Sequence, residues 1–133
     1  FITKIDKNKK IELDSLQNEK ILIENLKEKI NSDSLFLEQN EINKLLNDYN
    51  QKVNEFNNKV NNIELKYNQM IKENENILIN ALISIVEEIA DLKKLDLVLT
   101  EKNYFMVSDD IDLTTDIIKK LNLKNLTFKY ISD

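Results

Sequence analysis

The apolar positions in the middle of the chain repeat with the spacing of a coiled coil. Steps of four and three residues alternate between them, and Asn, Glu and Lys fill most of the positions in between. The repeat comprises Ile42, Leu46, Tyr49, Val53, Phe56, Val60, Ile63, Tyr67 and Met70. Because two turns of helix bring every seventh residue to the same face, the pattern predicts a long helix from Leu37 to Lys94 with a narrow apolar seam along its first half.

The segment before this helix has the composition of a partner helix. The run INSDS at 30–34 supplies residues typical of turns and helix N-caps, so the chain can fold back there into an antiparallel hairpin. In that register Ile5 faces Ile63. Glu12 and Glu19 interrupt the seam of the first helix, which we expect to be the weaker of the two. A short strand over FITKI at the N-terminal end is the alternative interpretation.

Beyond Met70 the long helix becomes apolar around most of its circumference. Asn74 continues the seam, where it either fixes the register or marks a widening of the seam. An exposed helix does not tolerate so many apolar side chains, so we expect this half to be buried by self-association. Ile85 and Ile89 are the helix residues that we assign to the interface between subunits.

The last third of the chain predicts a small β component. The alternation in LDLVL at 95–99, the polar run TEKN and the apolar run YFMV at 104–107 are typical of a β-hairpin. Thr114 or Thr115 can then start a short helix. The tail at 123–133 alternates weakly, and either adds an edge strand or remains mobile.

These elements predict a mainly α fold with a small β component. We expect a helical-hairpin coiled coil over 1–70, with its turn near 31–34, followed by a body over 71–122 and a tail over 123–133. The body combines the apolar helix end, the β-hairpin and the short helix, and it serves for oligomerisation. None of the parts is an independent domain, because 133 residues with 41% hydrophobic content provide one modest core.

The residue types that the chain lacks exclude several classes of function. It contains no Gly, Pro, Cys, His or Trp, so it has no imidazole base, thiol nucleophile or glycine-rich phosphate loop. We therefore expect no enzyme activity, no catalytic residues, no metal and no cofactor. The formal net charge is −5 and the lysines are scattered among acids, which argues against nucleic acid as a partner. No apolar run is long enough to cross a membrane.

The order of elements and the C-terminal motifs resemble the Skp/OmpH family of periplasmic chaperones. In that family a strand with a D-L-V core is followed by a second strand and by a helix with the pattern D-I-T-x-x-[VI]-L-x-x-[LV]. The strand motif corresponds here to Asp96, Leu97, Val98 and Leu99. The helix motif corresponds to Asp112, Leu113, Thr114, Ile117, Ile118 and Leu121. The order of elements agrees over nearly the whole chain, whereas the motif similarity is concentrated in its last third.

The resemblance implies an ATP-independent holdase that keeps unfolded outer-membrane β-barrel proteins from aggregating. It also implies a periplasmic homotrimer, in which strands build a central barrel and helical hairpins surround a cavity for the client. Family members begin with a strand ahead of the first hairpin helix, so we expect further residues before Phe1. The best-known members are basic, so we expect that attraction of the client to this acidic chain is either less electrostatic or depends on local Lys-rich surfaces.

The candidate client-binding residues, Leu35, Phe36 and Leu37, lie at the predicted hairpin tip. They either grip a client or touch the periphery of a membrane, or they close the turn and start the seam. The candidate oligomerisation residues are Ile85, Ile89, Leu95, Leu97, Val98, Leu99, Tyr104, Phe105 and Val107. The alternative function is a structural coiled-coil or adaptor protein that oligomerises through its C-terminal strands and has no affinity for unfolded chains.

Overall fold

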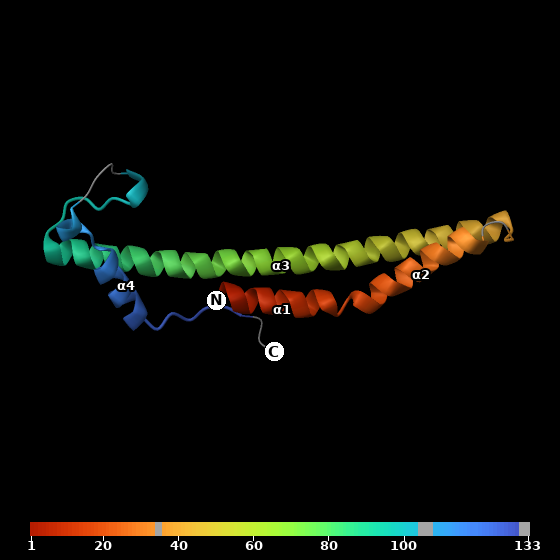
Figure 1. The fold of residues 1–133 in the computed structure, drawn as a ribbon, viewed down its shortest axis with the longest axis horizontal. Coiled ribbons are helices and arrows are strands. Elements are labelled where there is room, and N and C mark those ends of the chain that lie inside the picture. Colours follow the sequence, from red (N-terminus) through yellow and green to blue (C-terminus); the bar gives the residue numbers. More distant parts are fainter. Residues whose placement is uncertain (34–35, 104–107, 131–133) are drawn as a thin grey trace. The chain divides into compact units, whose positions relative to one another are not determined.

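A computed structural model describes residues 1–33, 36–103 and 108–130 of the chain. Helices dominate these residues (Figure 1). They are α1 (Ile2–Asp14), α2 (Gln17–Asp33), α3 (Gln39–Lys93) and α4 (Thr114–Leu123), with two short 3-10 helices, η1 (Glu101–Asn103) and η2 (Asp109–Ile111). The chain divides into two compact units, which we call the hairpin unit (Phe1–Ile71 with Tyr130) and the C-terminal unit (Lys72–Lys129). Helix α3 runs through both.

Helix α3 spans 55 residues without interruption, because the sequence places neither Gly nor Pro in it. It ends at Lys93, and Lys94 takes the left-handed conformation with a φ of 54°. The amide N–H of Leu95 then donates to the carbonyl of Ala90 at 2.9 Å, which satisfies one of the last free carbonyls of the helix. Glycine usually occupies this left-handed position, and a lysine takes it here.

The hairpin unit is an antiparallel arrangement in which α1 and α2 lie along the first half of α3 (Figure 1). Its core is formed by Ile5, Ile63 and Tyr67, whose side chains are buried. Ile5 and Ile63 are therefore neighbours, as the heptad register requires. Because α1 is helical from Ile2 onward, the alternative interpretation of FITKI as a strand is wrong.

The first arm of the hairpin is broken into two helices, where the sequence predicted one. The break lies at Ser15 and Leu16, between the two acids that interrupt the seam. The Ser15 hydroxyl donates to the Glu12 carbonyl at 2.6 Å, and the Leu16 amide bonds the Leu13 carbonyl three residues back. A serine side chain that bonds the backbone of the preceding turn competes with the helical ladder, which explains a break at this point.

The hairpin turn lies slightly later than predicted. Helix α2 continues through Asp33, so most of the INSDS run is helical. On the far side of the turn, the Glu41 carboxylate accepts from the Glu38 amide at 3.4 Å, one of the donors left free at the start of α3. Residues 34 and 35 lie outside the described part of the chain.

The C-terminal unit is built by α4 against the second half of α3. Ile85 and Ile89 are its buried apolar residues, with 0% and 2% of their surface exposed. Helix α4 begins at Thr114, whose amide donates to the Asp112 carboxylate at 2.8 Å. It contains the segment that the sequence predicted to be a short helix.

The predicted C-terminal β-hairpin is wrong, and with it the β component of the fold. No strand occurs in 1–33, 36–103 or 108–130, and 95–100 is irregular before η1 begins at Glu101. The alternation of LDLVL provides two different faces, but a strand also needs a neighbouring backbone to bond with, and 95–100 has none among the described residues. The second predicted strand, 104–107, lies outside the described residues.

Candidate binding surfaces

Of the two predicted client-binding residues that the structure describes at the hairpin tip, Phe36 is exposed to solvent. Phe36 is 85% exposed, and its amide donates to the Asp33 carbonyl at 2.9 Å, which fixes its backbone in the turn. Leu37 is half-buried, as expected of a residue that closes the turn. Leu35 lies outside the described residues. Client binding at the tip stays a prediction that concerns mainly Phe36.

The predicted oligomerisation residues fall into two different environments. Ile85 and Ile89 are covered by their own chain, whereas the side chains of 95–99 are exposed. Leu97 is 71% exposed and Leu99 is 48% exposed. The structure therefore does not gather the predicted residues into one free surface. Tyr104, Phe105 and Val107 lie outside the described residues, and the interface itself stays a prediction.

Exposed large apolar side chains continue along much of the C-terminal unit. They are Ile79, Ile83, Leu92, Leu95, Leu97, Val98, Leu99, Ile111, Ile118 and Leu123. Four of them follow one another in the five residues from 95 to 99. Scattered exposed apolar residues are ordinary, but a run of them that no regular structure covers indicates a surface that meets another molecule.

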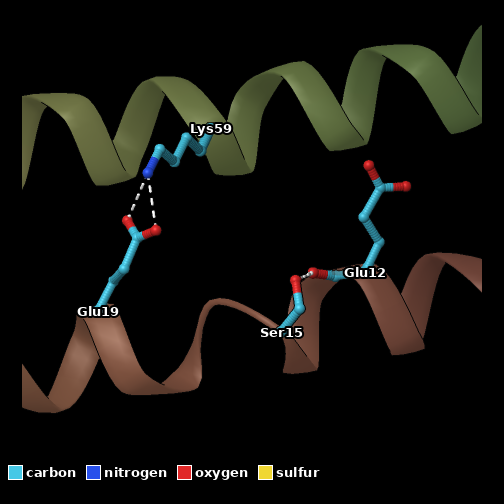
Figure 2. Close-up of polar contacts among 4 residues, drawn as sticks. All are labelled: Glu12, Ser15, Glu19 and Lys59. Atoms are coloured by element: carbon cyan, nitrogen blue, oxygen red, sulfur yellow. Dashed lines mark hydrogen bonds and ion pairs between the residues drawn. The ribbon is translucent and has the colours of Figure 1, made fainter.

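Cross-helix ion pairs fasten the two arms of the hairpin unit on both sides of the break in the first arm. Glu19 accepts from the Lys59 ammonium with both carboxylate oxygens, at 2.7 and 2.8 Å (Figure 2). Glu12 accepts from Lys66 with both oxygens at 3.0 Å. The two acids that interrupt the seam thus become the partners of lysines on α3. Exposed pairs of this kind each contribute roughly 0.2–1 kcal/mol.

Tyr67 extends the Glu12 pair into the core of the hairpin unit. Its ring is buried with Ile5 and Ile63, and its hydroxyl is hydrogen-bonded to the Glu12 carboxylate. Burial, together with this hydrogen bond, raises the pKa of Tyr67 to about 12. The hydrogen bonds from Lys66 and Tyr67 lower the pKa of Glu12. A buried aromatic ring whose hydroxyl is hydrogen-bonded is a structural feature of a core, and Tyr67 has both properties.

Ion pairs also connect α4 to the end of α3. Lys93 donates to Asp116 at 2.9 Å, and Lys120 donates to Glu88. These hydrogen bonds lower the pKa values of the two acids. Glu88 is thus engaged with a lysine.

Asn74 forms hydrogen bonds with the tail of the chain. The sequence identified Asn74 as an unusual seam residue but did not indicate this partner. Asn74 is fully buried, and its carboxamide bonds the backbone of Lys129 twice. The sequence allowed either a register-fixing role or a widening of the seam, and neither includes the tail. Two signals were present: a polar seam residue beyond the end of the first arm, and weak alternation at Leu126, Phe128 and Tyr130.

Within the ranges that the structure describes, no group of three or more acidic residues is placed to hold a metal ion. No helix there combines the length and apolar character needed to span a membrane. The candidate binding features are thus the exposed Phe36 at the hairpin tip, the exposed apolar side chains at 95–99 and the buried Asn74, which bonds the backbone of Lys129.

Comparisons with known proteins identify no relative of this chain. No family model matches the chain, and neither a curated protein nor a solved structure matches it significantly.

Proposed function

We propose that this protein is an ATP-independent holdase chaperone that binds unfolded polypeptides, with outer-membrane β-barrel proteins as its clients in the periplasm. The observation that carries the proposal is the run of exposed apolar side chains at 95–99, together with Ile79, Ile83 and Leu92 on α3. Unfolded chains expose apolar side chains in no fixed arrangement, so a binder needs apolar contacts distributed over a surface. The resemblance of the C-terminal motifs to the Skp/OmpH family supports the same class of function.

Self-association is part of the proposal. The resemblance implies three copies whose arms surround a client. The sequence assigned Leu95, Leu97, Val98 and Leu99 to contacts between subunits, so the oligomer size of a Leu97→Ser, Leu99→Ser variant decides whether this segment contacts the client or another subunit. A barrel of strands is not part of it, because the described residues contain no strand. Binding without nucleotide fits a chain that has no Gly for a phosphate-binding loop.

The proposal is tested by light scattering when a urea-unfolded outer-membrane β-barrel protein is diluted into buffer. The full-length protein should suppress aggregation without ATP and form a soluble complex with the client. A Leu97→Ser, Leu99→Ser double variant should lose most of this suppression. The matched control, Ile11→Ser with Leu65→Ser, removes two exposed apolar side chains from the hairpin unit and should retain it. Equal suppression by both variants would contradict the assignment of this surface.

The hairpin tip provides a separate arm of the same experiment. Phe36→Ser should weaken client retention without changing oligomer size, because Phe36 is exposed and outside the core. Unchanged retention would return the tip to a purely structural role.

A structural coiled-coil or adaptor protein is the second candidate. The observation in its favour is the ion-paired hairpin, in which Glu12 and Glu19 each hold a specific lysine on α3. Such pairs fix a register, which suits a stiff arm that positions a partner. Unaffected scattering in the presence of folded, oligomeric protein would favour this candidate over the holdase.

A further inference from the structure

The segment at 126–129 is held through the backbone of Lys129 by a buried side chain of α3. The Asn74 amide nitrogen donates to the Lys129 carbonyl at 2.8 Å, and the Lys129 amide N–H donates to the Asn74 side-chain oxygen at 2.6 Å. In an antiparallel sheet, a hydrogen-bonded pair of residues exchanges the same two bonds. The carboxamide of Asn74 therefore acts as a facing strand residue would, and it recognises an extended backbone.

The side chains of the segment alternate as those of an extended peptide bound along one face should. Leu126 and Phe128 are half-buried, whereas Thr127 and Lys129 are exposed. Successive side chains of an extended chain point to opposite faces, so every second one turns toward the protein. The sequence requirement is thus an apolar or aromatic residue at alternate positions.

The Lys129 side chain contributes little to recognition. Its ammonium pairs with Glu73 at 2.9 Å, but both groups are partly exposed, and exposed pairs are weak. Recognition consequently rests on the two backbone bonds and on the alternating apolar side chains. Any unfolded polypeptide with that alternation can supply both.

The burial of Asn74 explains why its carboxamide has a bonding partner in the free protein. None of its surface is exposed, and a buried carboxamide that loses its partners is strongly unfavourable. A segment of the same chain satisfies it at high effective concentration, and an incoming chain must replace that segment.

We propose that the Asn74 carboxamide is the centre of a site that binds extended polypeptide backbone, and that the segment at 126–129 is its intramolecular occupant, which leaves before another chain enters. The ligand class is an unfolded polypeptide with apolar side chains at alternate positions. This inference rests on the proposed function in so far as the incoming chain is the client. The segment then acts as an autoinhibitory strap.

Point variants of the full-length chain test the strap. Lys129→Pro removes the N–H that Asn74 accepts and still allows an extended backbone, whereas Lys129→Ala removes only the side chain. The probe is a fluorescent peptide with the sequence KNLTFKY of residues 124–130. Its binding to the protein is measured by fluorescence anisotropy. The Lys129→Pro protein should bind it about tenfold more tightly than the natural chain, since an occupant that has lost a backbone hydrogen bond competes less well. The Lys129→Ala protein should resemble the natural chain.

The role of Asn74 is tested on the Lys129→Pro background. Asn74→Ala should abolish peptide binding, and the matched control Asn76→Ala, at an exposed position two residues away, should leave it unchanged. A peptide that is N-methylated at the residue corresponding to Lys129 should also bind poorly, which tests the same bond without altering the protein. Equal binding of the methylated and unmethylated peptides would overturn the proposal, as would equal binding by Lys129→Pro and Lys129→Ala.

Sedimentation and aggregation assays separate the remaining outcomes. Self-association that Lys129→Pro abolishes would show that the occupant is the tail of a second copy, and would overturn the intramolecular strap. If peptide binding follows the expected order but no variant suppresses client aggregation, the peptide site at Asn74 is supported and the holdase function is contradicted. If all variants suppress aggregation equally and none differs in peptide binding, the holdase function is supported and the autoinhibitory role of the segment is contradicted.

Discussion

Helix α3 buries its apolar side chains in two different ways along its length. In the hairpin unit it has one narrow seam, whose buried residues Ile63 and Tyr67 pack with Ile5 of α1. In the C-terminal unit its apolar surface is wider, and its partners are the ten-residue α4 and an extended segment. A long helical partner covers a seam at every heptad, whereas short partners cover it only where they touch.

The difference decides where binding is to be sought. In the hairpin unit the seam packs against a helical partner, and cross-helix ion pairs connect the two arms. The C-terminal unit retains exposed Ile79, Ile83 and Leu92 on α3 and carries its run of exposed residues at 95–99. One helix thus carries a narrow seam in the hairpin unit and a wider, partly exposed apolar surface in the C-terminal unit, because the spacing of its apolar residues changes along it.

The largest expected effect tests whether both units have a packed core. Ile5→Ala in the hairpin unit and Ile85→Ala in the C-terminal unit each empty a site with 0% exposure, so each should lower the free energy of unfolding by about 2–5 kcal/mol. Urea unfolding, monitored by circular dichroism, measures the loss of unfolding free energy.

Exposed isoleucines in each unit serve as controls for this pair. Ile11→Ala and Ile83→Ala, at positions that are 59% and 51% exposed, should change the stability by less than about 0.5 kcal/mol. An Ile85→Ala protein as stable as the Ile83→Ala control would show that the C-terminal unit lacks the packed core described above.

The next effect concerns the alkaline stability of the hairpin unit. The pKa of Tyr67 is about 12 in the folded chain and near 10 in the unfolded chain, so its contribution is complete below pH 10 and is lost as the pH rises toward 12. A pKa difference of this size between the folded and unfolded chain corresponds to roughly 2–3 kcal/mol of unfolding free energy. The stability advantage of the natural chain over Tyr67→Phe should therefore shrink or reverse in that range.

Lysines deprotonate over the same range, but they do so in both proteins, so the difference between them isolates the tyrosine. Urea titrations at pH 9 and pH 11.5 measure it. A constant difference between the two proteins would mean that Tyr67 is not buried against Glu12.

The sequence predicted the hairpin better than the C-terminal unit, for a physical reason. A heptad seam specifies helix, partner and register at once, so Ile5 against Ile63 followed from spacing alone. The break at Ser15 did not follow. Glu12 and Glu19 marked the first arm as weak, but the competition between a serine hydroxyl and the helical ladder is settled by local geometry that spacing does not contain.

The C-terminal unit shows the opposite limit of sequence patterns. Alternation over 95–99 indicates two faces, and it does not reveal whether a neighbouring strand exists to pair with. The tail alternates in the same way, and there a side chain of α3 supplies the pairing. The partner of an extended segment is a tertiary property, which explains both the wrong β-hairpin and the unforeseen role of Asn74.

A smaller effect is expected where α3 ends. Lys94 holds a φ of 54°, a conformation that costs a residue with a Cβ atom roughly 1–2 kcal/mol. Lys94→Gly should therefore stabilise the C-terminal unit by about 1 kcal/mol, after the greater flexibility of glycine in the unfolded chain is deducted. The control Lys72→Gly places glycine inside the exposed helix and should destabilise by about the same amount. Thermal unfolding distinguishes the two, and a loss of stability in Lys94→Gly would contradict the assigned helix end.

The smallest effect tests the ion pairs that distinguish the hairpin unit. Lys66 and Tyr67 lower the pKa of Glu12 below its usual value of 4.5, so its contribution is present above pH 4.5 and is lost as the pH falls through the lowered pKa. Because the pair is partly exposed, Glu12→Gln should cost less than about 1 kcal/mol at pH 7 and nothing once Glu12 is protonated. Glu28→Gln on the exposed face of α2 serves as the matched control. High salt should reduce the same difference, since it screens an exposed pair. A difference between Glu12→Gln and the natural chain that persists unchanged at pH 2 would assign the contribution of Glu12 to packing, and the two units would then differ only in how their apolar surfaces are covered.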